Sequence, residues 1–325
     1  MKALQFVSAG SYALNDVPVP TIGDDEVLLA ARSVGICHSD IVLLEGRYIL
    51  PFSFPVTPGH EWSAEVMEVG QAVSSLRPGD RVVGECVVTE KDHFGFTMNG
   101  AMSEYFVAKA SWLHLIPENL SWTQGALVEP FSCGYNATLK ADNLDAADTA
   151  IVFGAGPIGL GVVAAAAAKG VRVLIAEPSA ARAQLARELG AEGVLDPSSE
   201  DFVEAALDAT QGGAPVVFEA SGHPSAMAAT LEVAAFKARV VNIGIDVGRS
   251  APAKLGLIQA KQLQIRGIIG SPGVWPETIR FLSRTGLDLS KLVTKTVPLA
   301  EATTAYDAVI NDKTQVKVHV TSDAR

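Results

Sequence analysis

The sequence predicts an α/β protein with two domains, a β-rich barrel and a doubly wound parallel sheet. Its 325 residues, 48% of them apolar, are too many for one comfortable hydrophobic core. Residues 1–130 show short alternating strands between turns, whereas residues 131–268 alternate strands with helices. Residues 269–325 are too few for a core of their own, so we expect them to pack back on the first domain.

The elements of the first domain are strands separated by turn sequences. Apolar alternation predicts strands at residues 2–7 and 27–36. Proline, glycine and aspartate mark turns at residues 18–20, 22–25 and 77–80. This succession of short strands is typical of a barrel.

The second domain alternates two kinds of element. We expect parallel strands at residues 149–153, 171–176, 215–219, 239–243 and 264–268, with helices such as 179–189 and 224–236 between them. In the last segment we expect helices near residues 276–283 and 300–310 and a closing strand at residues 315–320.

Charge and composition exclude several classes of partner. Residues 151–168 carry no charge and approach the length of a membrane span, but their four glycines and one proline fit a strand, a turn and a helix better. The excess of 36 acidic over 25 basic residues gives a net charge of −11, which disfavours nucleic acid and anionic membranes. Three cysteines form no disulfide framework and no apolar leader precedes the first strand, so we expect a cytoplasmic protein.

A glycine-rich loop follows the strand at residues 149–153. Its sequence is Gly154-Ala155-Gly156-Pro157-Ile158-Gly159. Gly154 permits a tight turn, Gly156 lets the backbone approach a pyrophosphate, and Gly159 lets the next helix pack close to the sheet. The helix N-terminus would then face the phosphates, so the loop predicts a dinucleotide site.

Glu177 ends the next strand, eighteen residues past Gly159, where such folds place a carboxylate against the adenosine ribose. A carboxylate accepts hydrogen bonds from ribose hydroxyls and repels a 2′-phosphate, so we expect NAD rather than NADP. Arg182 is near enough in sequence to reach a phosphate, which keeps NADP open. The other interpretation of Glu177 is a helix N-terminal charge without a ligand.

Cys37, His60 and Glu61 offer a thiolate, an imidazole and a carboxylate around the ends of expected barrel strands. Each has an ordinary alternative, since a buried cysteine is usually a small core residue and a single histidine is usually structural. Together with Glu129 and the glycine loop, however, they favour a metal ion beside a nicotinamide. That combination indicates alcohol chemistry.

The order of the motifs resembles that of the zinc-dependent medium-chain dehydrogenases, and most closely their sorbitol (polyol) dehydrogenase branch. The motifs are Cys37-His38-Ser39-Asp40, Gly59-His60-Glu61, residues 77–82, residues 126–130 and the glycine loop, with further matches at residues 219–222 and 242–244. The resemblance implies a GroES-like barrel, a Rossmann domain and a catalytic zinc in the cleft between them.

The resemblance makes Cys37 and His60 zinc ligands and Glu61 either a ligand or a close neighbour of one. Glu129 stands where alcohol dehydrogenases of the family have a cysteine ligand and where the polyol, threonine and butanediol branches have glutamate. Oxygen in place of sulfur hardens the site and leaves a more open position for water or a vicinal diol. Asp40 resembles the carboxylate that orients the ligand histidine, with a solvated turn aspartate as the alternative.

The sequence departs from the family where most zinc-containing relatives carry four cysteines for a structural zinc. Residues 84–99 contain only Cys86, so we expect one zinc per chain. Cys86 and Cys133 are then core or surface thiols, and His93 is expected to be solvated rather than a metal ligand.

A second departure concerns proton transfer. Val42 stands where many relatives have a histidine that passes the alcohol proton to solvent. Ser39 matches the hydroxyl that contacts the alcohol, although a simple turn hydroxyl is its alternative. Water, the cofactor ribose or Glu45 could complete the path, and the sequence does not choose among them.

The leading hypothesis is an NAD-dependent polyol or sugar-alcohol dehydrogenase with one zinc, and the runner-up is a 2,3-butanediol or threonine dehydrogenase. Other classes are a zinc-free quinone or alkene reductase and a non-catalytic NAD-binding protein. Trp275 falls where polyol relatives contact the small-molecule substrate, so it either walls the pocket or belongs to the core. The resemblance also implies a homodimer or homotetramer, joined through a sheet edge at residues 239–243 or 264–268.

Overall fold

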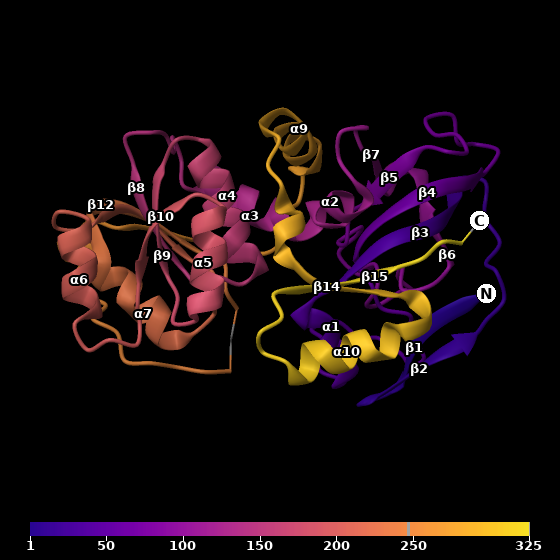
Figure 1. Cartoon of the computed structure of the whole chain (residues 1–325), viewed down its shortest axis with the longest axis horizontal. Coiled ribbons are helices and arrows are strands. Elements are labelled where there is room, and N and C mark those ends of the chain that lie inside the picture. Colours follow the sequence, from indigo (N-terminus) through magenta and orange to yellow (C-terminus); the bar gives the residue numbers. More distant parts are fainter. Residues whose placement is uncertain (246–247, 325) are drawn as a thin grey trace. The chain divides into compact units, whose positions relative to one another are not determined.

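The structure, a computed structural model, describes residues 1–245 and 248–324 and divides into two compact units (Figure 1). Unit 1 comprises Met1–Glu129 and Trp275–Arg325, and unit 2 comprises Pro130–Val274. The sequence places the corresponding changes after residues 130 and 268. The C-terminal segment thus belongs to the same unit as the N-terminal strands.

Unit 2 contains a six-stranded parallel sheet. In spatial order its strands are β10 (Ala191–Leu195), β9 (Arg172–Ala176), β8 (Thr149–Phe153), β11 (Ala214–Glu219), β12 (Ala234–Asn242) and β13 (Gln264–Gly267). The chain order reverses between β8 and β11, which is where doubly wound sheets bind ligands, at the carboxyl ends of the strands. The expected doubly wound parallel sheet is confirmed.

Helices pack on the strands of this sheet. α4 (Pro157–Ala168) contacts β8 and β9, α5 (Ala180–Glu188) contacts β9 and β10, α6 (Phe202–Ala209) contacts β10, and α7 (Pro224–Val233) contacts β11 and β12. α3 (Val128–Lys140) precedes β8, and the short α8 (Leu257–Ala260) precedes β13. The eight central residues of α4 are all buried glycine, alanine, valine or leucine, so this helix lies close to the strands.

Three expectations for unit 2 need correction. The helix expected at residues 224–236 ends at Val233, because Ala234 already begins strand β12. Strand β10 and helix α6 were not expected, since Glu192 and Gly193 interrupt the apolar pattern of β10. β12 lies between β11 and β13, so residues 239–243 do not form a sheet edge, whereas β13 does.

Unit 1 contains a largely antiparallel seven-stranded sheet and a two-stranded hairpin. The sheet consists of β14 (Val293–Pro298), β15 (Lys317–Thr321), β3 (Glu26–Ile36), β4 (Glu61–Val69), β5 (Arg81–Gly84) and β7 (Leu113–Leu115) in spatial order, with β6 (Tyr105–Lys109) paired to β3; the hairpin consists of β1 (Lys2–Ser8) and β2 (Ser11–Asp16). β3 is the longest strand and is mostly buried, so the sheet is built around it. The β-rich first domain is confirmed.

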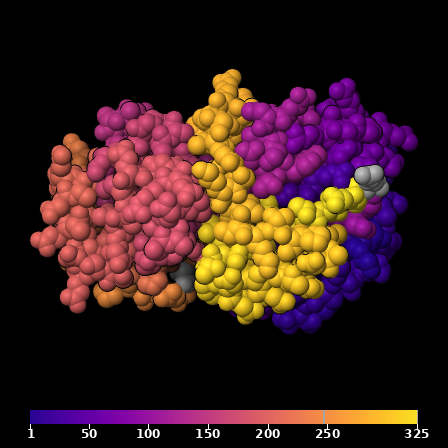
Figure 2. Space-filling model, in the orientation of Figure 1, coloured from indigo at the N-terminus to yellow at the C-terminus, as the bar shows by residue number. Residues whose placement is uncertain are grey.

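The C-terminal segment completes unit 1. The helices of this unit are α1 (His38–Leu44), α2 (Trp122–Ala126), α9 (Trp275–Thr285) and α10 (Ala302–Asn311), and its 3-10 turns are Ala110–Trp112, Leu289–Leu292 and Leu299–Glu301. β15 pairs antiparallel with β3, and α10 packs on β2, β3, β14 and β15. In Figure 2 the yellow C-terminal residues cover part of the indigo N-terminal ones on this face of unit 1. None of the helices in the described residues is long and apolar enough to span a membrane.

Candidate metal centre and dinucleotide loop

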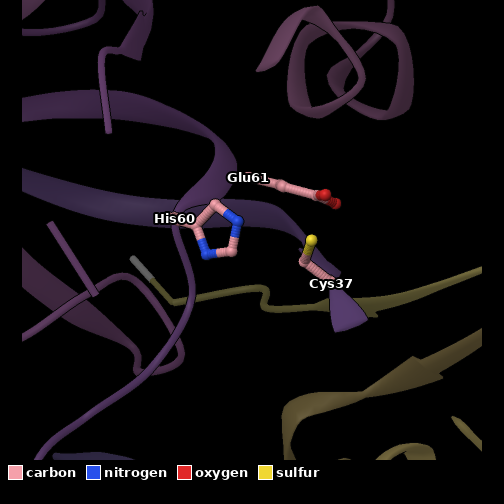
Figure 3. Close-up of side chains that lie close together, drawn as sticks. All are labelled: Cys37, His60 and Glu61. Carbon is pink, nitrogen blue, oxygen red and sulfur yellow. The ribbon is translucent and has the colours of Figure 1, made fainter. Parts of the chain in front are cut away.

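Three predicted metal donors meet where strand β3 ends and strand β4 begins. Cys37 directly follows β3, and His60 directly precedes Glu61, the first residue of β4. The antiparallel register pairs Gly35 with Glu61 and brings the two strand ends together. One donor atom from each of Cys37, His60 and Glu61 lies within 4.8 Å of the other two (Figure 3). A thiolate, an imidazole and a carboxylate at this spacing fit one zinc ion.

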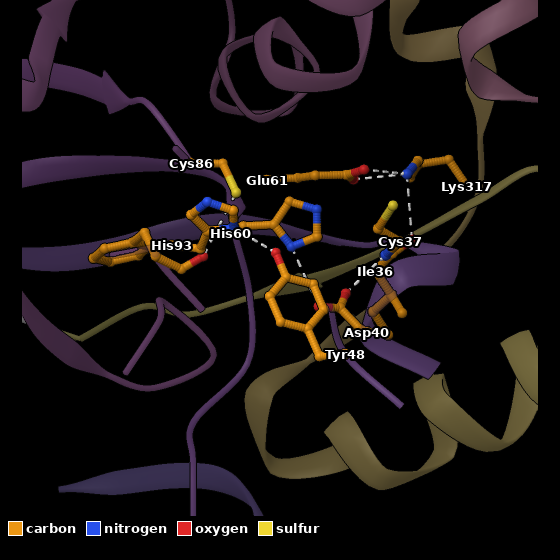
Figure 4. A network of polar contacts seen from close by, with 10 residues as sticks. Ile36, Cys37, Asp40, Tyr48, His60, Glu61, Cys86, His93 and Lys317 are labelled. Carbon is orange, nitrogen blue, oxygen red and sulfur yellow. Dashed lines mark hydrogen bonds and ion pairs between the residues drawn. The ribbon is translucent and has the colours of Figure 1, made fainter. Parts of the chain in front are cut away.

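Asp40 contacts two of these residues. Its side chain is fully buried, and its Oδ2 accepts a hydrogen bond of 2.8 Å from the backbone N–H of Cys37. Its Oδ1 lies 3.2 Å from Nδ1 of His60, which is also buried (Figure 4). Burial lowers the pKa of His60, but the charge of Asp40 and the hydrogen bonds to Asp40 and Cys37 together outweigh burial and raise that pKa well above its ordinary value. This arrangement leaves Nε2 of His60 for a metal ion, and it argues against Asp40 as a solvated turn residue.

A residue that the sequence analysis missed completes the group. Lys317 of strand β15 is buried, and its Nζ donates to both oxygens of Glu61, at 2.7 and 2.6 Å. It lies 256 residues from Glu61 in sequence. A single lysine in a short C-terminal strand has no motif around it and looks like an ordinary solvated charge, so the sequence offered no signal.

Glu129 lies in the first turn of α3 and is half-buried. It is not one of the three mutually close donors. Burial raises the pKa of Glu129 to about 7, the charge of His60 acts against that rise, and the charge of Glu61 adds to it. Glu129 therefore lies within electrostatic reach of the donors, and its role as a ligand stays a prediction.

Ser39, the first residue of the path expected to carry the alcohol proton to solvent, lies in helix α1. Ser39 is half-buried in its first turn, two residues after Cys37. Val42 offers no proton acceptor, as the sequence indicates. Glu45 is exposed and accepts a hydrogen bond of 3.0 Å from Arg47. The path beyond Ser39 stays open.

His93, expected to be solvated rather than a metal ligand, is half-buried and has a partner within the protein. Its Nδ1 lies 2.6 Å from the hydroxyl of Tyr48, and the two rings meet edge to face (Figure 4). The ring of Tyr48 stacks on Phe96 at 4.4 Å, and Phe96 in turn lies 4.5 Å from the ring of His60. The rings of His93, Tyr48 and Phe96 thus form a cluster that contacts the metal donor His60. All three residues lie in loops without a recognisable sequence motif.

Cys86 is a buried core thiol. Its sulfur lies 3.8 Å from the carbonyl oxygen of Phe94, and burial raises its pKa to about 12. Across residues 1–245 and 248–324, the group of Cys37, His60 and Glu61 is the one set of three close metal donors. The single zinc per chain stays a prediction.

The glycine-rich loop joins β8 to α4. Gly154 has a φ of +89°, and a Cβ on Gly159 would lie 1.9 Å from the carbonyl oxygen of Gly154. A Cβ on Gly156, by contrast, would meet nothing within 4 Å. Gly156 caps α4, and Pro157 and Ile158 belong to its first turn, whose N–H groups have no partner within the helix. The fold therefore needs Gly154 and Gly159, whereas the space at Gly156 fits an approaching pyrophosphate.

Glu177 lies beside this loop, directly after strand β9. Its Oε2 accepts a hydrogen bond of 2.7 Å from the N–H of Ala155, and its Oε1 accepts one of 2.9 Å from Ser179. Arg182 is in the first turn of α5, where its N–H points to the Ser179 hydroxyl at 3.5 Å. The carboxylate is placed as expected for a ribose contact, but its backbone partners also account for it without a ligand. Its role in NAD binding stays a prediction.

Trp275 is the first residue of α9 and is 3% exposed. Its ring stacks on His114 within unit 1, with the ring centroids 5.8 Å apart. This burial favours the core alternative over a pocket wall.

Comparisons with known proteins agree with the fold and the donor set. Residues 23–118 match the family model of the alcohol dehydrogenase GroES-like domain, and residues 157–284 match that of zinc-binding dehydrogenases. D-arabitol-phosphate dehydrogenase of Enterococcus avium is 31% identical over 332 residues, covering 96% of this chain and 94% of that protein. Sorbitol dehydrogenase of Bacillus subtilis strain 168 is 28% identical, covering 97% of this chain and 95% of that protein.

A solved structure gives the same answer. The crystal structure of 2R,3R-butanediol dehydrogenase from Bacillus subtilis matches this chain with a TM-score of 0.92 at 32% identity, covering 98% of this chain and 99% of that one. Fold and donor set together define a zinc-dependent oxidoreductase that uses a nicotinamide cofactor. The chain belongs to the zinc-dependent medium-chain dehydrogenase/reductase family, in its sorbitol dehydrogenase-like branch. The expected family, the GroES-like and Rossmann fold and the alcohol or polyol oxidoreductase class are confirmed.

Proposed function

We propose that this protein transfers a hydride between a secondary alcohol group of a polyol or sugar alcohol and NAD. The single observation that carries the proposal is the close group of Cys37, His60 and Glu61. A zinc ion bound there would lower the pKa of a substrate hydroxyl, and the nicotinamide would accept the hydride.

The residues of unit 1 hold the donors and accept the proton. Cys37 and His60 bind the metal, and Asp40 fixes the ring of His60 so that Nε2 faces the other donors. Ser39, two residues from Cys37, accepts the proton of the alcohol hydroxyl at its Oγ and in the same step passes its own hydroxyl proton on to water, the cofactor ribose or Glu45. Tight placement of these groups is what makes the transfer fast, because the reacting atoms need no further alignment.

Two features support a polyol as the substrate. Glu129 supplies an oxygen near the donors where a sulfur ligand would favour a softer and more closed site. The D-arabitol-phosphate and sorbitol dehydrogenases align with nearly the whole chain. A 2,3-butanediol substrate is the second candidate, supported by the match to the butanediol dehydrogenase structure.

Glu177 supports NAD over NADP. Its carboxylate lies at the glycine loop, bonded to the N–H of Ala155, where a 2′-phosphate would be repelled. We also propose that the chain holds one zinc, since the buried thiol of Cys86 is the one cysteine of residues 84–99.

A homodimer or homotetramer is supported by the edge strand β13. Among the described residues this strand has one neighbour, β12, and two apolar side chains are exposed here, Ile265 within the strand (38%) and Ile269 two residues past its end (68%). An unpaired edge with apolar side chains favours pairing with a second copy. The three free cysteines support a reducing compartment, the cytoplasm.

The test is metal analysis of the purified protein followed by a dehydrogenase screen with polyols, 2,3-butanediol and threonine, each with NAD and NADP. We expect one zinc per chain and NADH formation with a polyol. Protein without zinc that reduces neither cofactor with any alcohol after zinc addition would contradict the proposal. Reduction of a quinone without zinc would instead support the zinc-free reductase.

A further inference from the structure

Tyr48 and His93 form a hydrogen-bonded pair to which the catalytic scheme above gives no role. The hydroxyl of Tyr48 lies 2.6 Å from Nδ1 of His93, and both side chains are half-buried. Among the described residues, neither the hydroxyl nor the imidazole ring makes a further hydrogen bond. Both groups therefore keep hydrogen-bonding capacity that a bound molecule can use.

The capacity that remains suits a hydroxyl group. Burial lowers the pKa of His93 and raises that of Tyr48, so both side chains are uncharged at pH 7. If Tyr48 donates to the ring, its oxygen is left to accept a hydrogen bond; if the ring donates to Tyr48, the phenol O–H is left to donate. A ligand hydroxyl, which can itself donate or accept, fits Tyr48 in either tautomer of His93.

The pair lies close to the metal donors. The ring of Tyr48 stacks on Phe96, and the ring centroid of Phe96 lies 4.5 Å from that of His60. Besides burial, the charges of Cys86 and His60 act on the pKa of Tyr48. Figure 4 shows the Tyr48 hydroxyl directed toward His93 and the donor group. A substrate bound at the donors would therefore lie near this hydroxyl.

The turn that carries His93 is held by its own backbone. Gly95 has a φ of +78°, and a Cβ on it would lie 3.1 Å from the backbone N of His60, so the missing side chain lets this turn lie against the metal donor. The N–H of His93 donates to the hydroxyl of Thr97 at 2.8 Å, and the N–H of Thr97 donates back to the carbonyl of His93 at 3.0 Å. The turn thus does not need the contact with Tyr48 for its conformation.

The loops that carry the pair also border open space. Residues that follow Tyr48 and Phe96 in sequence line a pocket of about 370 Å³, among them Phe52, Thr97 and Met98. This volume lies within the usual range of small-molecule sites. A ligand that reaches Tyr48 therefore has room for further atoms along these loops.

We propose that Tyr48 is a specificity-determining residue that binds a second hydroxyl group of the substrate, with His93 as its positioning partner. The inference deepens the proposed function and rests on it, since it concerns the same site. A polyol gains this hydrogen bond, whereas an alcohol with a single hydroxyl group does not. The pair therefore raises the preference of the enzyme for polyols over simple alcohols.

Tyr48→Phe tests the proposal through binding, because it removes the hydroxyl and keeps the ring that stacks on Phe96. Protein loaded with zinc and NADH, which cannot turn over an alcohol, is titrated in a calorimeter with sorbitol and with 2-butanol. The Kd for sorbitol should rise about fivefold, as expected for one lost hydrogen bond, while the Kd for 2-butanol stays unchanged. Equal weakening of both ligands, or unchanged sorbitol binding, would overturn the proposal.

Steady-state kinetics with NAD add a second readout. In Tyr48→Phe the KM for sorbitol should rise by the same factor while kcat stays close to that of the parent, because the lost contact serves binding and not hydride transfer. A structural role of the pair predicts a fall in kcat instead, since displaced donors would slow the transfer. A lower kcat with an unchanged KM would therefore contradict the proposal.

Replacing the partner shows whether His93 acts through Tyr48. His93→Phe keeps an aromatic ring but removes both nitrogens, so the Tyr48 hydroxyl loses its orientation and the Kd for sorbitol should rise, by less than in Tyr48→Phe. In the Tyr48→Phe background, His93→Phe should weaken sorbitol binding no further. Weakening that persists in that background would overturn the positioning role.

Tyr12→Phe is the matched control for loss of a tyrosine hydroxyl. The hydroxyl of Tyr12 also makes a hydrogen bond of 2.6 Å within unit 1, to Asp307, and its loss should leave the Kd for sorbitol unchanged. An equal rise in Tyr12→Phe would overturn the proposal. If the parent binds no zinc and oxidises no polyol, the proposed function fails; if the parent oxidises sorbitol but Tyr48→Phe binds it normally, only this inference fails.

Discussion

The metal region of unit 1, which comprises Cys37, His60, Glu61 and their partners Asp40 and Lys317, uses charged side chains. The glycine loop of unit 2 uses backbone groups instead. In the metal region, buried charged side chains hold one another, as Asp40 does with His60 and Lys317 with Glu61. In the loop, the backbone N–H groups at the start of α4 and the open space at Gly156 provide the expected pyrophosphate site. Removing one charge of the metal region should therefore lower the zinc affinity of the whole donor group. NAD binding at the loop should instead respond mainly to added side-chain volume.

The strongest way to break the metal region is to remove its thiolate. Cys37→Ser puts a hydroxyl, which keeps its proton at neutral pH, in place of a thiolate ligand. We expect zinc to be lost on dialysis and kcat/KM to fall by more than about a hundredfold. This loss should exceed that caused by removing a residue that contacts a metal ligand without binding the metal itself. Metal analysis and steady-state kinetics measure the two effects. Cys133→Ser is the matched control for thiol removal and should retain zinc; full zinc in Cys37→Ser would contradict the ligand assignment.

A smaller loss is expected when a charge behind a ligand is removed. Asp40→Asn keeps a group that can accept from the N–H of Cys37 but removes the charge beside His60. We expect zinc affinity to fall by about 10–100-fold, measured by competition with a chelator. Asp80→Asn is a close control, because Asp80 also accepts from a backbone N–H three residues earlier, at 2.9 Å, and does not belong to the donor group. Equal losses in both variants would mean that Asp40 acts only through its backbone contact.

Whether a site residue could be predicted from the sequence depended on whether it lies in a short local motif. Cys37, His60 and the glycine loop lie in short motifs whose residue types carry the chemistry, so both regions were found. Lys317 was missed because its contact with Glu61 depends on β15 pairing with β3, and neither strand signals that pairing locally. The contact of His93 with Tyr48 was not foreseen for a similar reason, since Tyr48 comes from a separate loop.

Fold prediction failed where local patterns are weak. The doubly wound sheet and most of its strands follow from clear apolar runs bounded by glycine, and β8 was predicted with its exact ends. The run of alanines around Ala234 suits a helix and a strand almost equally, so the end of α7 was placed too late. Tertiary pairing of β12 with β11 decides that boundary, and this information is not local.

Added volume in the loop should separate binding from stability. Gly156→Ala adds a methyl group that meets no protein atom, so the melting temperature should stay unchanged while the Kd for NAD rises about tenfold, equivalent to about 1.4 kcal/mol. Gly159→Ala should instead destabilise unit 2, since its Cβ overlaps the carbonyl of Gly154. Calorimetry and thermal unfolding distinguish the two. Normal NAD binding by a stable Gly156→Ala protein would contradict a pyrophosphate at this position.

The smallest effect should come from a buried histidine behind the metal region. Burial and the charge of Lys317 lower the pKa of His319 to about 3, and its Nδ1 lies 2.8 Å from the hydroxyl of Ser33. In the unfolded chain His319 takes up a proton near pH 6.5, whereas in the folded chain it stays neutral, so stability falls as the pH drops from about 6.5 toward 3. This one group should cost about 1 kcal/mol between pH 7 and pH 5.5.

Urea unfolding of metal-depleted protein at the two pH values measures that loss. His319→Gln should lower stability at both pH values but should lose about 1 kcal/mol less than the parent between them, because glutamine does not titrate. His223→Gln, which removes an exposed histidine of unit 2, should lose as much as the parent. An equal loss in His319→Gln and the parent would mean that folding does not lower the pKa of His319. That result would contradict the effect of burial and of the charge of Lys317 on this histidine.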